Sequence, residues 1–288
     1  MIFFFCVFTS IYGCSKKPSA QASNKAQILQ VVVSGYAPYS IAKEVLKDIA
    51  DISILIPPGA DAHHFEPLPS TIAEIQKADY FFYISDKMEP WALKISNGSG
   101  LALAVNLPNL NPKDPHVWID FANTYKMAEN IASVVVVKHP EFEDKLAKNL
   151  GVFSGELKML DRLYSKIFTN CQSRDIYHIG HMAFGYMAKK YNLNFRPLIG
   201  ATFGAEPSAK NMATMIKEIK NKHLSYIFTE EALNSKIAAT IAAESNAKTL
   251  NLYTIEQATK DEFEQNISYK QFMMMNLENL TKGLGCGE

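Results

Sequence analysis

The sequence alternates short β-branched strand patterns with helical patterns in units of about 30 residues, and this alternation constrains the fold most. Residues 28–33, closed by Ser34 and Gly35, are typical of a strand buried on both faces of a sheet. Successive strand–helix–strand units predict right-handed crossovers and mostly parallel sheets. The strand patterns cover residues 28–33, 52–56, 80–84, 101–105, 176–179, 195–198, 226–228 and 249–252.

One long helical pattern separates the two runs of alternation. No proline follows Pro140 until beyond residue 168, and apolar residues recur there at steps of three and four. A helix of up to ~28 residues would span ~42 Å, enough to run along the whole molecule. The other helical patterns begin at Pro69 or cover residues 39–49, 121–137, 183–191, 208–222, 235–245 and 269–283. The predicted fold is therefore α/β, with two similar lobes of mostly parallel sheets joined by one long continuous helix.

The first 13 residues are an apolar run too short to span a bilayer, for which about 20 apolar residues are needed. A small residue precedes Cys14 and a polar stretch follows it, as in a lipoprotein signal whose cysteine is acylated. No Lys or Arg precedes Cys14, although a secretory signal normally opens with a positive region. Two alternatives stay open: an incomplete start, or a frayed apolar N-terminus with an incidental cysteine.

These patterns predict five segments along the chain. They are a signal peptide at 1–13, a flexible tether at 14–27, an N-terminal lobe at 28–139, a connecting helix at 140–170 and a C-terminal lobe at 171–288.

Charge and cysteine content exclude several classes of protein. The 29 basic and 29 acidic residues cancel, so net charge favours neither nucleic acid nor an anionic membrane as partner. Among the four cysteines, Cys171 and Cys286 are as compatible with a disulfide as with two free thiols. No C-x-x-C motif occurs, which disfavours zinc held by thiolates.

Three histidines stand in distinct short signatures far apart in the sequence: GADAHHFEP around His63, DPHVW around His116 and HMAFGY from His181. Imidazole is a strong ligand for zinc and related metals, so three that converge would predict a metal site. A helix start after His181 would favour its neutral, metal-binding form. The remaining histidines are interpreted as non-ligands: His64 as solvated, His139 as a helix-cap neighbour, His178 as core or behind the ligands, and His223 as surface.

A series of motifs occurs in a fixed order over nearly the whole chain beyond Cys14. They are IPPG before H-x-FEP, IQKAD before an aromatic strand, MEPW, DPHVW, H-x-AFGY with KKYNL, EPS, IFTE and a methionine-rich last helix. In this order the chain resembles the zinc/manganese solute-binding lipoproteins of bacterial ABC importers. The resemblance implies two α/β lobes bridged by one long helix, with metal held between the lobes.

The resemblance also implies the ligands. His63 and His116 would come from the first lobe and His181 from the second. A histidine at the third ligand position is similar to what the zinc-type members have there. The family commonly has an aspartate as fourth ligand, where our alignment has Tyr253, a poor zinc ligand. Three histidines with water would then complete the site, or a carboxylate from Glu206 or Glu230 would join it as a ligand or support it from behind the ligands.

The leading hypothesis is a non-enzymatic, monomeric protein in the cell envelope, lipid-anchored through Cys14, that captures Zn²⁺ and delivers it to an ABC permease. A binder of Mn²⁺ or Fe²⁺ is the nearest alternative. A zinc hydrolase is another, because three histidines with an open position also describe catalytic sites, but no H-E-x-x-H motif supplies a base. An adhesion or scaffold lipoprotein with a structural metal is the third.

Overall fold

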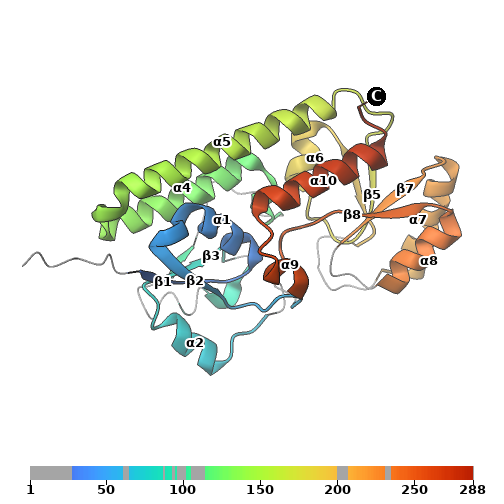
Figure 1. Cartoon of the computed structure of the whole chain (residues 1–288). Coiled ribbons are helices and arrows are strands. Elements are labelled where there is room, and N and C mark those ends of the chain that lie inside the picture. Colours follow the sequence, from blue (N-terminus) through green and yellow to red (C-terminus); the bar gives the residue numbers. More distant parts are fainter. Residues whose placement is uncertain are drawn as a thin grey trace, which may run out of the picture.

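The computed structural model describes residues 28–60, 65–86, 88–92, 95, 102–104, 114–199, 207–230 and 235–287. Two α/β lobes lie next to each other, and long helices run across both (Figure 1). The predicted signal peptide, the tether and Cys14 lie outside the described residues. Within the described residues, no helix is long and apolar enough to cross a membrane.

Among the described residues, each lobe has a four-stranded sheet, and both sheets have the same strand order. The order is β2-β1-β3-β4 in the N-terminal lobe and β6-β5-β7-β8 in the C-terminal lobe, with every pairing parallel. The strands are β1 (Leu29–Val33), β2 (Ala50–Ile54), β3 (Tyr80–Tyr83), β4 (Ala102–Ala104), β5 (Asp175–Ile179), β6 (Asn194–Pro197), β7 (Tyr226–Thr229) and β8 (Lys248–Asn251). The predicted α/β class, the two lobes and the parallel sheets are confirmed.

The helices follow the predicted patterns closely. They are α1 (Tyr36–Leu46), α2 (Pro69–Ile75), α4 (Phe121–Lys138), α5 (Glu143–Ile167), α6 (Gly185–Tyr191), α7 (Ala209–Asn221), α8 (Ser235–Ser245), α9 (Lys260–Glu264) and α10 (Tyr269–Leu284). Short 3₁₀ segments cover Lys47–Ile49, Val117–Ile119 and Pro140–Phe142. We did not predict α9, a five-residue helix begun by a capping box on Thr259, because it is too short to show a helical period.

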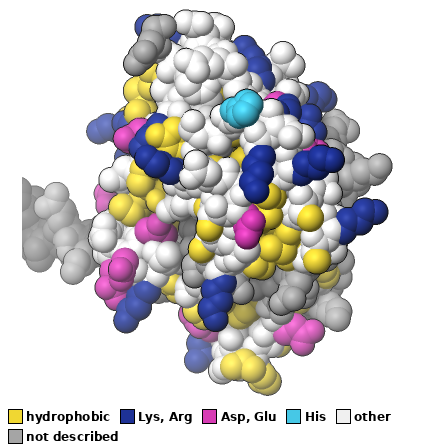
Figure 2. All heavy atoms as spheres, turned by 90° about the vertical axis from the view of Figure 1, so that its right-hand side faces the viewer, with side chains coloured by type: hydrophobic (Ala, Val, Ile, Leu, Met, Phe, Trp, Pro, Cys, Tyr) yellow, Lys and Arg dark blue, Asp and Glu magenta, His cyan; other side chains and the backbone are white. Residues whose placement is uncertain are grey.

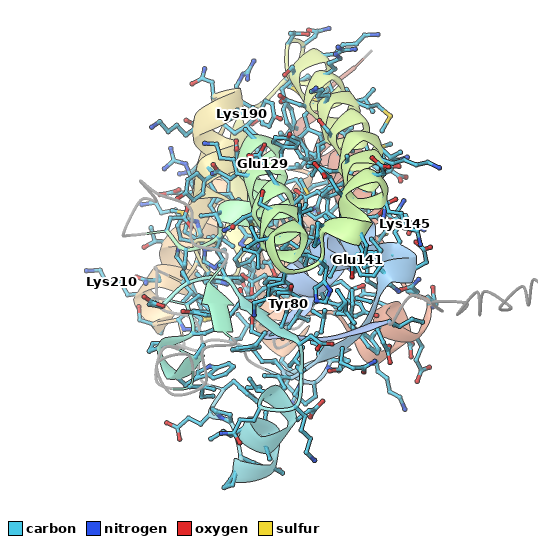
Figure 3. The ribbon with its side chains drawn as sticks, turned by 90° about the vertical axis from the view of Figure 1, so that its left-hand side faces the viewer. Tyr80, Glu129, Glu141, Lys145, Lys190 and Lys210 are labelled. Carbon is cyan, nitrogen blue, oxygen red and sulfur yellow. A yellow bond between two sulfur atoms is a disulfide. The ribbon has the colours of Figure 1, made fainter. Side chains whose placement is uncertain are left out.

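The connecting helix is α5, whose 25 residues extend for about 37 Å. Its first predicted turn is 3₁₀ instead, since Pro140 starts a separate short segment. α4 and α5 lie side by side (Figure 3) and pack along each other. Lys190 of α6 bridges to them through Asp161 (2.9 Å) and Asp120 (3.7 Å). The first helix of the C-terminal lobe is thereby fixed to the connecting helices.

The largest buried apolar cluster extends across both lobes and includes α5 and α10. Tyr164 of α5 donates its hydroxyl to the carbonyl of Met273 in α10 at 2.6 Å. After α10, Cys286 forms a disulfide with Cys171, which closes the alternative that the sequence left open. The last helix is therefore tied to the rest of the molecule by packing and by a covalent bond. The residue boundaries of the predicted domains stay a prediction.

Candidate metal centre

His116 lies just before the 3₁₀ segment Val117–Ile119 and is 1% exposed. Asp114, two residues earlier, accepts a hydrogen bond from the backbone N–H of His116 at 3.1 Å. The same Asp114 oxygen lies 2.9 Å from Nδ1 of the His116 ring. An Nδ1–H that donates to a carboxylate fixes the tautomer and leaves Nε2 available to bind a cation.

His181 follows β5 at the carboxyl end of the C-terminal sheet and is also 1% exposed. One oxygen of Glu230, which follows β7, lies 2.7 Å from both the backbone nitrogen and Nδ1 of His181. A side chain at Gly180 would lie 2.2 Å from that oxygen, so the close approach requires glycine. Both histidines thus have the same support, a buried carboxylate on Nδ1 that turns Nε2 the other way.

The two Nε2 atoms converge on a third group, Glu256. They lie 2.9 Å apart, and Oε2 of Glu256 lies 3.5 Å from that of His116 and 3.4 Å from that of His181. Glu256 is 3% exposed, and these three residues are the only metal-type cluster found among the described residues. Zinc ligands at 2.0–2.1 Å in tetrahedral geometry lie about 3.3 Å apart, so the triangle has the size that such an ion needs.

The buried carboxylates favour a cation at this point. Burial lowers the pKa of His181, but its hydrogen bond to Glu230 and the nearby Glu256 outweigh burial and raise the pKa to about 10. For His116, burial likewise lowers the pKa, and Asp114 and Glu256 raise it above its ordinary value on balance. The expected helix start directly after His181 is wrong, because α6 begins only at Gly185 and Glu230 is the group beside the His181 ring instead.

His64 lies outside the described residues, and His139, His178 and His223 have the environments that the sequence suggested. His178 is fully buried, and burial lowers its pKa to about 4 although Glu230 opposes this. His139 ends α4 and lies 3.2 Å from Glu141. His223 is exposed.

At the end formed by the C-terminal lobe, basic, acidic and apolar side chains are interspersed (Figure 2), as expected for zero net charge.

The predicted site residues have different outcomes. The structure brings His116 and His181 together from distant parts of the sequence. His63 and Glu206 lie outside the described residues. Glu230 contacts the Nδ1 side of His181, away from the Nε2 atoms, so the carboxylate at the convergence point is another one.

Sequence reasoning missed Glu256. We compared the family's fourth position with Tyr253, but Tyr253 bonds through its backbone to Asn276, and Glu256 three residues later reaches the histidines. The only available signal was an acidic residue a few positions after the last strand, where side chains project from a parallel sheet. That signal is common and would not have singled out Glu256.

Comparisons with known proteins agree with this geometry. Residues 31–283 match the family model described as zinc-uptake complex component A, periplasmic. The high-affinity zinc uptake system protein ZnuA of Bacillus subtilis (strain 168) is 32% identical over 302 residues, covering 96% of this chain and 94% of that protein.

Two further relatives differ in how much of their length the chain matches. The zinc-binding protein AdcA of Streptococcus pyogenes serotype M18 is 32% identical over 88% of this chain, which spans only 55% of AdcA. The crystal structure of the Zn(II)-bound ZnuA-like domain of Streptococcus pneumoniae AdcA is 28% identical, with a TM-score of 0.78 over 90% of this chain and 99% of that domain.

These relatives are metal-uptake and metal-binding proteins, which gives the hydrolase alternative no support. The resemblance found in the sequence is confirmed. Because the family model matches most of this chain, the chain belongs to the periplasmic zinc-uptake component A family of solute-binding proteins.

Proposed function

We propose that this protein captures Zn²⁺ outside the cytoplasmic membrane and delivers it to the permease of an ABC transporter. The observation that carries the proposal is the buried triangle formed by Nε2 of His116, Nε2 of His181 and Oε2 of Glu256, with sides of 2.9–3.5 Å. Imidazole and carboxylate together suit zinc, whereas Mn²⁺ prefers a shell richer in oxygen. The relatives are a zinc uptake protein and a zinc-binding protein, which supports the same metal.

We assign the fourth ligand to His63. The backbone N–H of Gly59 donates to the carbonyl of Ala258 at 3.0 Å, which joins the start of the His63 loop to the segment that carries Glu256. Only three residues lie between Gly59 and His63, so the loop begins within reach of the triangle. A set of three imidazoles and one carboxylate would close a tetrahedral shell.

The test of the site is a chelator-competition titration of the purified protein with Zn²⁺ and, separately, with Mn²⁺. His116→Ala and Glu256→Gln are each expected to lower zinc affinity by a hundredfold or more, because each removes a direct ligand. His223→Ala is the matched control, since His223 is exposed and outside the site. Unchanged zinc affinity in His116→Ala, or tighter binding of Mn²⁺ than Zn²⁺ by the wild type, would refute the assignment.

X-ray absorption of the zinc complex tests the ligand set. We expect four nitrogen and oxygen neighbours near 2.0 Å, with the imidazole signature reduced in His63→Ala and in His116→Ala. A spectrum of His63→Ala identical to that of the wild type would remove His63 from the shell.

We further propose that Cys14 is acylated and holds the protein at the membrane as a monomer. The polar stretch after Cys14 supports a flexible tether, and one relative is named as a zinc-binding lipoprotein. Cys14→Ala should release the protein from the membrane fraction and abolish incorporation of a labelled fatty acid. Zinc uptake by cells should then fall, while the zinc affinity of the purified protein stays the same.

A further inference from the structure

A hydrogen bond from Trp118 joins the segments that carry His116 and Glu256. The indole N–H of Trp118 donates to the backbone carbonyl of Thr254 at 2.7 Å, and Trp118 is fully buried. Trp118 follows His116 by two residues, and Thr254 precedes Glu256 by two. Two three-residue segments therefore form a ring, closed at one end by this hydrogen bond and at the other by His116 and Glu256.

Ile255, which lies between Thr254 and Glu256 in that ring, has an unusual backbone conformation. Its φ is +60°, in the left-handed region, and its side chain is fully buried in the main apolar cluster. A β-branched residue rarely adopts this conformation, because its side chain crowds the backbone there. Surrounding contacts must hold it, and strain of this kind concentrates at functional sites.

Helix α10 fixes both sides of the ring. The hydroxyl of Tyr269 donates to the carbonyl of Trp118 at 2.7 Å. Seven residues later on the same helix, the buried side chain of Asn276 accepts from the N–H of Tyr253 at 2.7 Å and donates to its carbonyl at 2.8 Å. Residues seven apart share a helix face, so one face of α10 supports both segments.

We propose that Trp118 is a positioning residue, whose indole N–H holds the carbonyl of Thr254, keeps Ile255 left-handed and so directs Glu256 at His116 and His181. This inference rests on the proposed role of Glu256 as a ligand. It assigns a function to the aromatic residue of the DPHVW motif beyond covering His116, from which its ring lies 5.3 Å away.

The test compares the two tryptophans of the chain. Trp118→Phe removes the indole N–H and keeps an aromatic ring in the core. Trp91→Phe removes an indole N–H that has no hydrogen-bond partner among the described residues, so it is the matched control. We expect Trp118→Phe to lower zinc affinity by about 10- to 100-fold, as for other residues that orient a metal ligand, and Trp91→Phe to change it less than about threefold.

A double variant separates positioning from general packing. If Trp118 acts through Glu256, zinc affinity of Trp118→Phe/Glu256→Gln should equal that of Glu256→Gln alone, because no carboxylate remains to be directed. The absorption spectrum of bound Co²⁺ should also be the same in Trp118→Phe and in Glu256→Gln. Additive losses, or a wild-type Co²⁺ spectrum in Trp118→Phe, would overturn the inference.

Glu256→Gln distinguishes the two proposals. Unchanged affinity in Glu256→Gln would refute its role as a ligand and the inference with it. A weakened Glu256→Gln beside an unaffected Trp118→Phe would overturn only the inference.

A second pair of variants keeps the inference testable even if Trp118→Phe does not fold. Ile255→Ala and Ile255→Gly both lose the buried side chain, but only glycine is free of strain at φ +60°. The metal-free glycine variant should therefore unfold at a temperature a few degrees higher than the alanine variant, the reverse of the usual order. A lower melting temperature for glycine would mean that Ile255 is unstrained and that Trp118 has nothing to hold.

Discussion

The two lobes share a strand order, and in each lobe a buried glutamate follows the third strand in sequence, Glu89 six residues after the end of β3 and Glu230 directly after β7. In the N-terminal lobe, Glu89 accepts hydrogen bonds from the hydroxyl of Ser34 (2.5 Å) and from the N–H groups of Ile84 (3.1 Å) and Ser85 (3.0 Å). In the C-terminal lobe, Glu230 contacts the backbone and the ring of His181, both at 2.7 Å.

The difference lies in the residue that follows the central strand. Ser34 follows β1 and gives Glu89 a neutral partner, whereas His181 follows β5 and gives Glu230 a ring that can face a cation. Burial raises the pKa of Glu89 to about 7, against the hydrogen bonds from Ser34, Ser85 and Ile84. One sheet thus uses its glutamate to close a turn, and the other uses it to orient a histidine.

We expect the largest change in stability from loss of the disulfide, because this bond links two residues of the C-terminal lobe and the N-terminal lobe has no part in it. Cys171→Ser/Cys286→Ser should lower the free energy of unfolding by about 2–5 kcal/mol, since a bond across 115 residues restricts the unfolded chain. Urea unfolding measures this, and reduced wild-type protein should match the double variant. A loss well below 1 kcal/mol would show that α10 is held by packing alone.

The pKa of Glu89 predicts a pH dependence from the N-terminal lobe. Its folded value, about 7, lies above the ordinary 4.5, so the unfolded chain releases the proton first and stability falls as pH rises from 4.5 to 7. Glu89→Gln, which mimics the protonated acid, should remove this loss of up to about 3 kcal/mol. Unfolding of the zinc-free protein at pH 5 and 8 is the measurement, and parallel wild-type and variant profiles would contradict it.

Zinc affinity should depend on Glu230 in the C-terminal lobe and not on Glu89 in the N-terminal lobe. Glu230→Ala removes the acceptor on Nδ1 of His181 and should lower zinc affinity about 10- to 100-fold. Glu89→Gln is the control and should change it less than about threefold. Chelator competition on both proteins decides, and similar affinities would mean that Glu230, like Glu89, only supports the fold.

His178 in the C-terminal lobe should cause a smaller change of stability with pH, opposite in sign to the change caused by Glu89. Its folded pKa of about 4 lies below the ordinary 6.5, so the unfolded chain takes up a proton first as pH falls through this window. The zinc-free wild type should lose about 2 kcal/mol of stability between pH 7 and pH 5 that His178→Phe does not lose. Phe184 and Phe195 already surround the ring and offer an apolar site for the replacement. Equal losses in both proteins would contradict the prediction.

Much of the fold could be predicted because the signals are local. The period of apolar residues located β1, β5, α4 and α5 within a few residues, and the shared order of motifs led to the correct family. The short helix α9 and the choice between a disulfide and two thiols at Cys171 had no such signal.

The sequence by itself determined the α/β architecture and singled out His116 and His181, which the structure brings together, because strand and helix periods and short motifs depend on neighbouring residues. Only the tertiary structure decided which carboxylate meets them. Glu256 reaches the histidines through a left-handed turn at Ile255, held by Trp118 and by α10. The hydrogen bond of Trp118 joins residues 136 positions apart, and the turn at Ile255 sets the backbone against the preference of its own side chain, so no local pattern encodes either.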